Sequence, residues 1–517
     1  MRLRLSAALL LVAAVIASPR PAEAQNRYVH ANNSPYDTLD PHAVNDVGRA
    51  ASRINLYDGL YRWVDNPPKM IPWLAESHTA SPDGLTYTVK LRAGVKFHDG
   101  TEMTAADVVY SMERMLGMKK GPASFFLGTI EPGTTQAPDK LTVVFRLKEP
   151  SAIFAAVLPE IQVVNSALVK KNEKDGDWGE TWLSKNDAGS GSFALRRYDP
   201  AVGFIATRFK DHFLGWEPGR KWFDEIEFRS ILDTNTRVLG LIKGDWQGVD
   251  GYLPYDQIER LRKEPSIQVL EQESMRVFLF CINASKPPFD NVHFRRALSY
   301  AFDYDGFIND ILKGSVARNP TSNPNNLWGT PKDVKGYVYD LDKAKEELQK
   351  YGGPLRPITI NALAGFAESE QASVLLANSL RKIGIDARVE TSPWSLVSQR
   401  FLKAETMLDM VPLWKSTFYA DPNNWVGELF STRYLGGRNL NWYSNPALDK
   451  LTEAALKTTD QAERARLYEA AVRLVVDEAA NIFVYNTKWF GPYSNKIDGI
   501  RFSPVGNGQE MRWAYYK

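Results

Sequence analysis

Residues 85–92, LTYTVKLR, alternate strictly between apolar and polar side chains, the period of a strand with one buried face. In the segment that follows, Thr104 can cap a helix, and Asp107 stands at the third helical position, as in a capping box. Four apolar side chains then share one helical face: Val108, Met112, Met115 and Leu116. The pattern predicts a strand followed by a helix.

The same order of elements returns later in the chain. Residues 356–363 and 385–391 read as strands, and 367–384 reads as a helix that Gly384 closes in a left-handed turn. Asn445 and Asp460 are good caps for two more helices. The chain shows no internal repeat and no long flexible linker, so we expect a mixed α/β protein with interwoven domains.

The first residues have the pattern of an export signal. Arg2 and Arg4 precede an apolar run over 5–17, and Ala22-Glu23-Ala24 forms a small-residue cleavage site. Residues 1–24 are therefore predicted to be a cleaved signal peptide. No later run reaches about 18 apolar residues, the length of a membrane span.

Cysteine content refines the predicted compartment. Cys281 is the single cysteine of the 517 residues, so no internal disulfide can form. No cysteine stands at the cleavage site to carry a lipid anchor, which favours a protein that diffuses freely in the periplasm. Removal of three Arg and one Glu with the signal peptide takes the net charge from +2 to zero, and nothing indicates nucleic-acid binding.

Familiar catalytic motifs are missing from the sequence. It has no HExxH, no GxSxG, no P-loop and no GxGxxG, and its six His do not stand at metal-ligand spacing. The Gly-rich segment 188–193, AGSGSF, lacks the Lys of a phosphate cradle and reads as a turn. We expect no metal and no cofactor. A hydrolase built from distant carboxylates stays open as an alternative.

Residues 413–430, LWKSTFYADPNNWVGELF, concentrate five aromatic rings around one Asp-Pro pair. Such a stretch is more often buried core, and it also fits a wall that holds a ligand against flat rings. The residues alone leave both interpretations open.

Segment 97–115, FHDGTEMTAADVVYSMERM, resembles the signature of the family 5 extracellular solute-binding proteins of ABC importers, the group of oligopeptide- and dipeptide-binding proteins. The resemblance extends in order along nearly the whole mature chain. Its other segments are TLDPHAVNDVGRAASRINLYDGL, GSGSFALRRYDP, RVLGLIKGDW, NASKPPFDNVHFRRALSYAFDYDGFI, DLDKAKEELQKYG, LRKIGIDARVE and NPALDKLTEAALKTTDQAERARLYEAA.

The resemblance implies a type II periplasmic-binding-protein fold of the large cluster C type, with two lobes on a hinge and three interwoven domains. A solute is enclosed between the first and third domains, and the closed monomer delivers it to a membrane permease driven by an ATPase. The implied boundaries are 25–65, 190–280 and 488–517 for domain I, 66–189 for domain II, and 281–487 for domain III.

The resemblance also implies which residues line the cleft. The candidates are Asn33, Tyr36, Arg276, Trp394, Arg400, Trp414, Lys415, Ser416, Thr417, Tyr419, Asp421, Trp425, Tyr485 and Asn486.

Peptide-binding members commonly carry an Asp about three residues after the Trp of the aromatic segment, where it pairs with the peptide's ammonium. After Trp414 this chain has Lys415, Ser416 and Thr417 instead. A buried ammonium without a carboxylate partner is costly. Either Asp421 replaces the missing partner, or the solute lacks a free amino terminus, as an oligosaccharide, opine or modified peptide does. We favour a solute without a free amino terminus over an oligopeptide or dipeptide.

A periplasmic chaperone or sensory receptor is a further alternative function.

Overall fold

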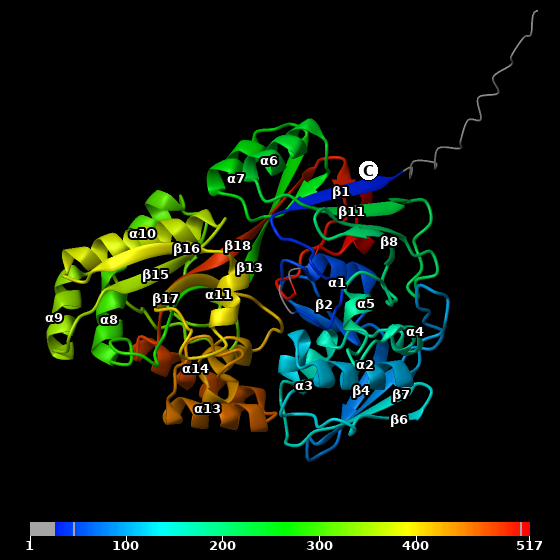
Figure 1. Ribbon diagram of the computed structural model, residues 1–517, viewed down its shortest axis with the longest axis horizontal. Coiled ribbons are helices and arrows are strands. Elements are labelled where there is room, and N and C mark those ends of the chain that lie inside the picture. Colours follow the sequence, from blue (N-terminus) through cyan, green and yellow to red (C-terminus); the bar gives the residue numbers. More distant parts are fainter. Residues whose placement is uncertain (1–25, 45–46, 507–508) are drawn as a thin grey trace, which may run out of the picture.

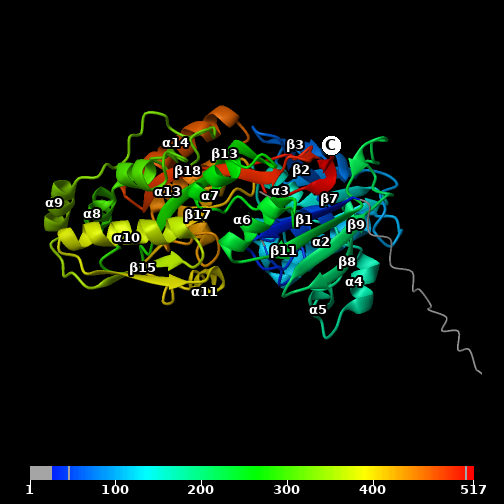
Figure 2. The ribbon, with the colours of Figure 1, turned by 90° about the horizontal axis from the view of Figure 1, so that it is seen from above.

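The computed structural model describes residues 26–44, 47–506 and 509–517. The predicted signal peptide, 1–24, lies outside these ranges. Two lobes lie side by side in Figure 1, and Figure 2 shows the same two lobes from above. Helices and strands mix in both lobes, which confirms the predicted α/β class.

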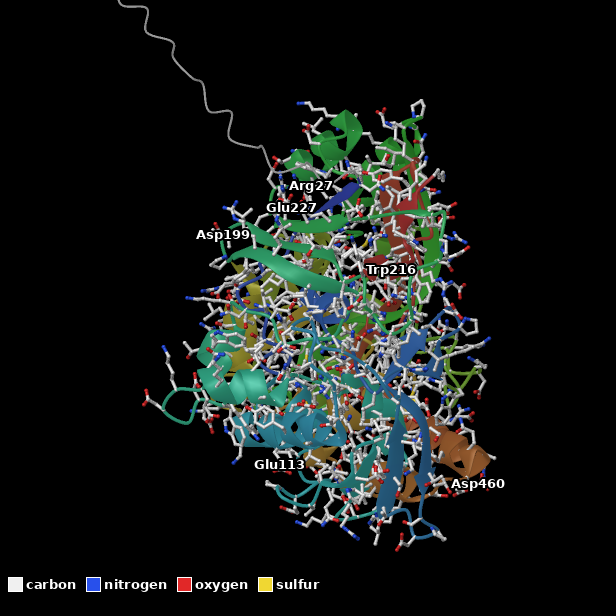
Figure 3. The ribbon with its side chains drawn as sticks, turned by 90° about the vertical axis from the view of Figure 1, so that its right-hand side faces the viewer. Arg27, Glu113, Asp199, Trp216, Glu227 and Asp460 are labelled. Atoms are coloured by element: carbon white, nitrogen blue, oxygen red, sulfur yellow. The ribbon has the colours of Figure 1, made fainter. Side chains whose placement is uncertain are left out.

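The largest sheet extends through both lobes. Its strands, in spatial order, are β16 (Ala387–Ser392), β15 (Ile358–Leu363), β17 (Met410–Lys415), β13 (Ile267–Ile282), β18 (Asn481–Ser494), β12 (Gly248–Val249), β1 (Arg27–Asn32), β11 (Glu225–Ser230), β9 (Gly203–Arg208) and β8 (Phe193–Asp199), with β14 (Ala317–Arg318) paired to β18. Arg27 and Glu227 form an ion pair between the neighbouring parallel strands β1 and β11, and Figure 3 shows the two side chains together.

Strands β13 and β18 carry the chain between the lobes. Residues 267–273 of β13 pair with residues 488–494 of β18 in the first lobe. In the second lobe, residues 277–282 pair with β17 on one side and with 481–486 on the other. A register shift separates the two halves between Glu273 and Val277. Because a bulge bends a strand locally, this shift marks the hinge.

Smaller sheets belong to the first lobe. A four-stranded sheet contains β4 (Ala75–Ala80), β5 (Thr86–Leu91), β7 (Thr142–Arg146) and β6 (Gln136–Asp139). A hairpin contains β2 (Tyr61–Val64) and β3 (Lys69–Pro72), and a three-stranded sheet contains β10 (Lys221–Trp222), β20 (Tyr515–Tyr516) and β19 (Ile497–Asp498). The four-stranded sheet lies within the predicted domain II. The three-domain division and its boundaries stay a prediction.

Helices surround these sheets. In the first lobe they are α1 (Ala50–Leu56), α2 (Ala105–Met118), η1 (Gly121–Phe125), α3 (Phe154–Val157), η2 (Leu158–Glu160), α4 (Ser166–Asn172), α5 (Glu180–Leu183), α6 (Thr234–Lys243), α7 (Tyr255–Arg262) and η6 (Met511–Trp513). In the second lobe they are α8 (Val292–Ala301), η3 (Gly306–Ile311), α9 (Leu341–Tyr351), α10 (Ala367–Lys382), α11 (Trp394–Arg400), η4 (Pro422–Asn424), α12 (Val426–Phe430), η5 (Thr432–Tyr434), α13 (Pro446–Lys457) and α14 (Gln461–Asp477).

The predicted local structure is confirmed in detail. The alternating segment forms β5, and Thr104 and Asp107 form the capping box of α2. All four apolar residues on the predicted face of α2 are buried. The side chains of Asn445 and Asp460 accept hydrogen bonds from the first turns of α13 and α14. Gly384 has a φ of 89°, the left-handed conformation expected after α10.

A buried ion pair joins α2 to the loop after β1. Both Arg114 and Asp40 have fully buried side chains, and the guanidinium donates to the carboxylate at 2.9 and 2.5 Å. Arg114 also donates from Nε to the Trp178 carbonyl at 2.7 Å. Removing one partner would leave a charge buried without compensation, so this pair fixes α2 against the loop after β1.

We expect Arg114→Met to lower the free energy of unfolding by about 3–5 kcal/mol, because Asp40 keeps its buried charge and loses its partner. Urea unfolding followed by circular dichroism measures the change. Arg473→Met is the matched control. Its ion pair with Asp333 is exposed, and such pairs contribute at most about 1 kcal/mol. Equal losses in the two variants would contradict this role for Arg114.

Candidate functional site

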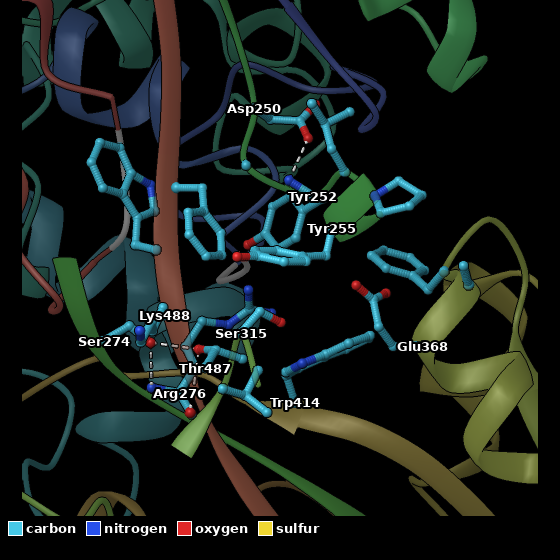
Figure 4. Close-up of a pocket in the computed structure, with 18 of the residues that line it drawn as sticks. Asp250, Tyr252, Tyr255, Ser274, Arg276, Ser315, Glu368, Trp414, Thr487 and Lys488 are labelled. Atoms are coloured by element: carbon cyan, nitrogen blue, oxygen red, sulfur yellow. Dashed lines mark hydrogen bonds between the residues drawn. The ribbon is translucent and has the colours of Figure 1, made fainter. Parts of the chain in front are cut away.

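A cavity of about 160 Å³ lies between the lobes, beside the crossing strands. Residues 250–255 line it from the first lobe, and residues 365–368 line it from the second. Ser274 and Thr487 line it from β13 and β18 (Figure 4). Since both lobes and the hinge contribute walls, relative movement of the lobes changes the cavity directly.

The second-lobe wall comes from one edge of the sheet. Strands β15 and β17 are parallel, so their carboxyl ends reach the same edge. Trp414 lies near the end of β17, and Glu368 lies in the first turn of α10, after β15. Ligands of open α/β sheets bind outside the carboxyl ends of strands. The fold therefore puts these two side chains where a ligand site is expected.

Aromatic rings from both lobes meet in the cavity. The Phe366 ring lies 5.4 Å from Trp414, which belongs to the same lobe. It also lies 6.2 Å, edge to face, from Tyr252 of the first lobe. Trp414 in turn packs 5.0 Å from Phe278 of β13. These rings form a rigid apolar wall with small conformational cost.

Arg276 supplies a cation to the cavity, and the register shift of β13 positions it there. Its guanidinium carbon lies 4.8 Å from the centre of the Tyr252 ring and 5.8 Å from that of Trp414. Its Nε is buried and has no hydrogen-bond partner among the described residues. A planar guanidinium with an unused donor is well suited to a carboxylate.

Glu368 supplies an acid. Figure 4 shows its carboxyl group directed into the cavity from the second lobe. Burial raises the pKa of Glu368 above its ordinary value, and the nearby Arg276 guanidinium opposes this rise. Glu368 forms no ion pair within the described residues. It is available to a cationic group that enters the cavity.

Asp250 is a second acid in the wall, but its oxygens are engaged. They accept the backbone N–H groups of Tyr252 at 2.8 Å and of Asn33 at 2.7 Å, and Arg237 lies 3.5 Å away. Burial raises the pKa of Asp250, while Arg237 and these donors oppose the rise. Asp250 therefore shapes the loop that presents Tyr252.

Of the fourteen candidate residues, three line the cavity: Arg276, Trp414 and Tyr485. Two others touch cavity residues. Asn33 bonds to Asp250, and the Asn486 side-chain amide lies 3.5 Å from the Ser274 carbonyl. The remaining nine are not among the lining residues: Tyr36, Trp394, Arg400, Lys415, Ser416, Thr417, Tyr419, Asp421 and Trp425.

After Trp414, the aromatic segment is buried away from the cavity. Thr417, Tyr419 and Trp425 have no exposed surface. Asp421 pairs with Arg464 at 2.7 Å and accepts the Asn423 N–H at 3.0 Å, so it acts as a cap and an ion-pair partner. The segment thus combines both interpretations, with Trp414 in the cavity and the residues after it packed. A solute role for the packed residues stays a prediction.

Lys415 belongs to a buried charge cluster. Its Nζ donates to Glu428 at 2.8 Å, and Glu428 also accepts from Arg438 at 2.7 Å and from the Tyr419 hydroxyl at 2.9 Å. The other candidates lie apart. Tyr36 is buried in the first-lobe core, Ser416 accepts from Asn424 through its carbonyl, and Trp394 and Arg400 are the two ends of α11.

The sequence reasoning missed Glu368, Phe366, Tyr252 and Asp250. For Glu368 and Phe366 a signal was present, because both stand where a predicted strand passes into a predicted helix. Tyr252 and Asp250 follow the two-residue strand β12, which has too few residues to show a period.

Within 26–44, 47–506 and 509–517, no group of three or more His, Cys, Asp or Glu is arranged to hold a metal ion. In the same ranges, no helix has the length and apolarity needed to cross a membrane.

Comparison with known proteins gives consistent matches. The family model described as bacterial extracellular solute-binding proteins, family 5 Middle, matches residues 69–436. A probable D,D-dipeptide-binding periplasmic protein of Escherichia coli K12, DdpA, is 31% identical over 84% of this chain and 82% of its own length. The glutathione-binding protein GsiB of E. coli O6:K15:H31 is 29% identical over 93% of each.

A solved structure has the same architecture. The periplasmic binding protein DppA of Helicobacter pylori, in complex with the peptide STSA, superposes with a TM-score of 0.85 at 26% identity. The match covers 95% of this chain and 98% of that one. The predicted two-lobed binding-protein fold is confirmed by this likeness.

The buried amine of Lys415 yields a test of the charge cluster. Burial, and secondarily Arg438, lowers its pKa from 10.5 to about 8, although Glu428 opposes the shift. Between these values the unfolded chain binds more protons than the folded chain, so stability attributable to Lys415 rises with pH. We expect the unfolding free energy of the wild type, relative to Lys415→Met, to increase from pH 8 to 10.5 in urea titrations. Lys457→Met, at an exposed position, serves as control, and parallel curves for wild type and Lys415→Met would contradict the assignment.

Proposed function

Because the chain belongs to the extracellular solute-binding proteins of family 5, a family of binding and transport proteins, we propose that it captures a small solute in the hinge cavity for an ABC importer. The lobes close around the solute, and the closed form is what the membrane permease and its ATPase receive. In this role the protein acts as a periplasmic monomer. No bond of the solute is broken.

The observation that carries the proposal is that Arg276 and Glu368 both line one aromatic cavity. Arg276 offers donors to a carboxylate, and Glu368 offers an acceptor to an ammonium group. The rings of Trp414, Phe366 and Tyr252 accept the apolar part of the solute. We infer a compact solute that carries both a carboxylate and a cationic group.

This solute class differs from the one that the sequence favours. The preference for a solute without a free amino terminus depends on the lack of a carboxylate after Trp414. Glu368 brings a carboxylate to the same cavity from α10, so an ammonium group has a partner there. The argument against a free amino terminus therefore loses its basis. A dipeptide-sized zwitterion becomes the better proposal.

The relatives support a solute of this size. DdpA is described as D,D-dipeptide-binding and GsiB as glutathione-binding, and the H. pylori protein holds a peptide of four residues. These solutes share a free carboxylate and a free amino group in a small molecule. D-alanyl-D-alanine and glutathione are accordingly the first probes to use.

Closure follows from the two-sided cavity. A solute that contacts Tyr252 and Trp414 together gains its full interaction only when the lobes are closed. It therefore shifts the population toward the closed form by its differential affinity. The bulge of β13 and the residues Asn486 and Thr487 of β18 are the part of the chain that must bend.

Calorimetric titration of Glu368→Gln tests the cation subsite. We expect affinity for D-alanyl-D-alanine to fall at least about thirtyfold, since a buried ammonium without its partner costs roughly 2–5 kcal/mol. Glu370→Gln is the matched control, two residues along α10 and exposed. The N-acetylated dipeptide should bind the wild type and Glu368→Gln equally weakly.

Retained affinity in Glu368→Gln, together with tight binding of the acetylated dipeptide, would contradict the zwitterion proposal and return the preference to a solute without a free amino group. Turnover of either probe would instead favour a hydrolase over a binding protein.

The raised pKa of Glu368 predicts a pH dependence. As pH falls through that pKa, the carboxyl group binds a proton and loses the charge that attracts the ammonium group. As the pH is lowered, affinity for D-alanyl-D-alanine should therefore begin to fall at a higher pH than it would if Glu368 had the ordinary Glu pKa of about 4.3. Titrations at successive pH values check this. The dependence should be missing in Glu368→Gln, and an identical profile in that variant would exclude Glu368 as its source.

A further inference from the structure

The lobes meet at a second place, away from the hinge cavity. Phe125, at the end of η1 in the first lobe, lies 5.7 Å from Phe418 and 5.9 Å, edge to face, from Tyr419 of the second lobe. The guanidinium carbon of Arg438 lies 4.9 Å from the Phe125 ring and 4.3 Å from the Phe418 ring. None of these four residues lines the cavity.

This contact buries apolar side chains that belong to different lobes. Phe125, Phe418, Tyr419 and Leu456 are each less than a tenth exposed, and the last three join the core cluster of the four-stranded sheet. The Ala152 N–H also donates to the Leu456 carbonyl at 2.8 Å across the same boundary. If the lobes separated, these rings and this hydrogen bond would face water.

Arg438 is positioned for the contact before the lobes meet. Glu428 accepts from its Nε at 2.9 Å and from its terminal nitrogen at 2.7 Å, so the guanidinium is fixed within the second lobe. A fixed guanidinium presents its flat face to Phe125 with little further loss of freedom. Its positive charge also acts on the first lobe. Burial raises the pKa of Glu160 there, and the charges of Arg53 and Arg438 oppose this rise.

An exposed ion pair lies at the edge of the contact. Arg433 of the second lobe donates to Glu149 of the first at 2.5 Å, and each side chain is about one third exposed. The buried rings form an apolar centre, and the Arg433–Glu149 pair forms a polar rim, which is the usual anatomy of a protein interface.

We propose that Phe125, Phe418, Tyr419 and Arg438 form a clasp that stabilises the closed arrangement of the lobes in addition to the contacts of the solute. These residues act on solute binding indirectly, because they stabilise closure without contacting the solute. The clasp raises the fraction of molecules in the binding-competent closed form, and apparent affinity scales with that fraction. This inference goes beyond the proposed function, because the clasp acts whatever solute the cavity binds.

The first test measures lobe separation without added solute. Spin labels on Ala137→Cys in β6 and Ala447→Cys in α13 report on opposite lobes, since both positions are exposed. Cys281 is buried, which keeps it from the labelling reagent. We expect Phe125→Ala to move most of the distance distribution to longer values. Leu127→Ala, exposed and two residues further along, should leave it unchanged. Overlapping distributions for Phe125→Ala and wild type would overturn the clasp.

The second test compares two solutes. Phe125→Ala should lower the affinities for D-alanyl-D-alanine and for glutathione by the same factor, three- to tenfold. The reason is that it lowers only the fraction of molecules in the closed form. Unequal factors would place Phe125 in the solute site and overturn the proposal. If neither probe binds, the proposed solute class fails, while the label distances still decide on the clasp.

A charge exchange guards against misfolding of Phe125→Ala. Glu149→Arg puts like charges opposite each other at an exposed position and should shift part of the distance distribution to longer values. Adding Arg433→Glu restores the attraction and should shift it back. Failure of the double variant to restore the distances would overturn the proposal.

Discussion

The two lobes are connected by a pair of hydrogen-bonded strands, β13 and β18, and this constraint governs the rest of the structure. Backbone pairing shifts register between Glu273 and Val277, where the chain passes between the lobes, and again between Phe278 and Leu279. A paired ribbon resists sliding and stretching but bends where its ladder is irregular. The lobes can therefore rotate about the bulge while the strands keep the two cavity walls facing each other.

The hinge also explains why charge gathers where it does. Arg276 lies within the bulge and stacks on rings of both lobes, so its environment changes with their separation. Glu368 approaches from the second lobe and forms no ion pair with another described residue. A carboxyl group without an ion-pair partner and a guanidinium with an unused Nε donor, both inside a cavity, are unfavourable for the protein alone. The arrangement becomes favourable when a solute supplies the complementary charges, which couples binding to closure.

Local structure and family were accessible from the sequence, because capping boxes, strand alternation and helix periods are short-range patterns. The aromatic segment was identified as well, and Trp414 indeed lines the cavity. Sequence spacing could not show that the chain is buried after Trp414. Lys415 pairs with Glu428, and Asp421 pairs with Arg464, which lies 43 positions further along the chain. It likewise could not bring Glu368 beside Arg276, which are 92 positions apart. Those contacts depend on how β15 and β13 are placed in the sheet.

Native mass spectrometry of gently purified protein, wild type and variants, tests most directly where the solute is held. The account predicts one small molecule per wild-type chain, with both an acid and an amine, that is lost from Arg276→Met and Glu368→Gln and retained by Lys415→Met. Retention by both cavity variants, with loss from Lys415→Met, would move the site into the segment after Trp414 and contradict the account.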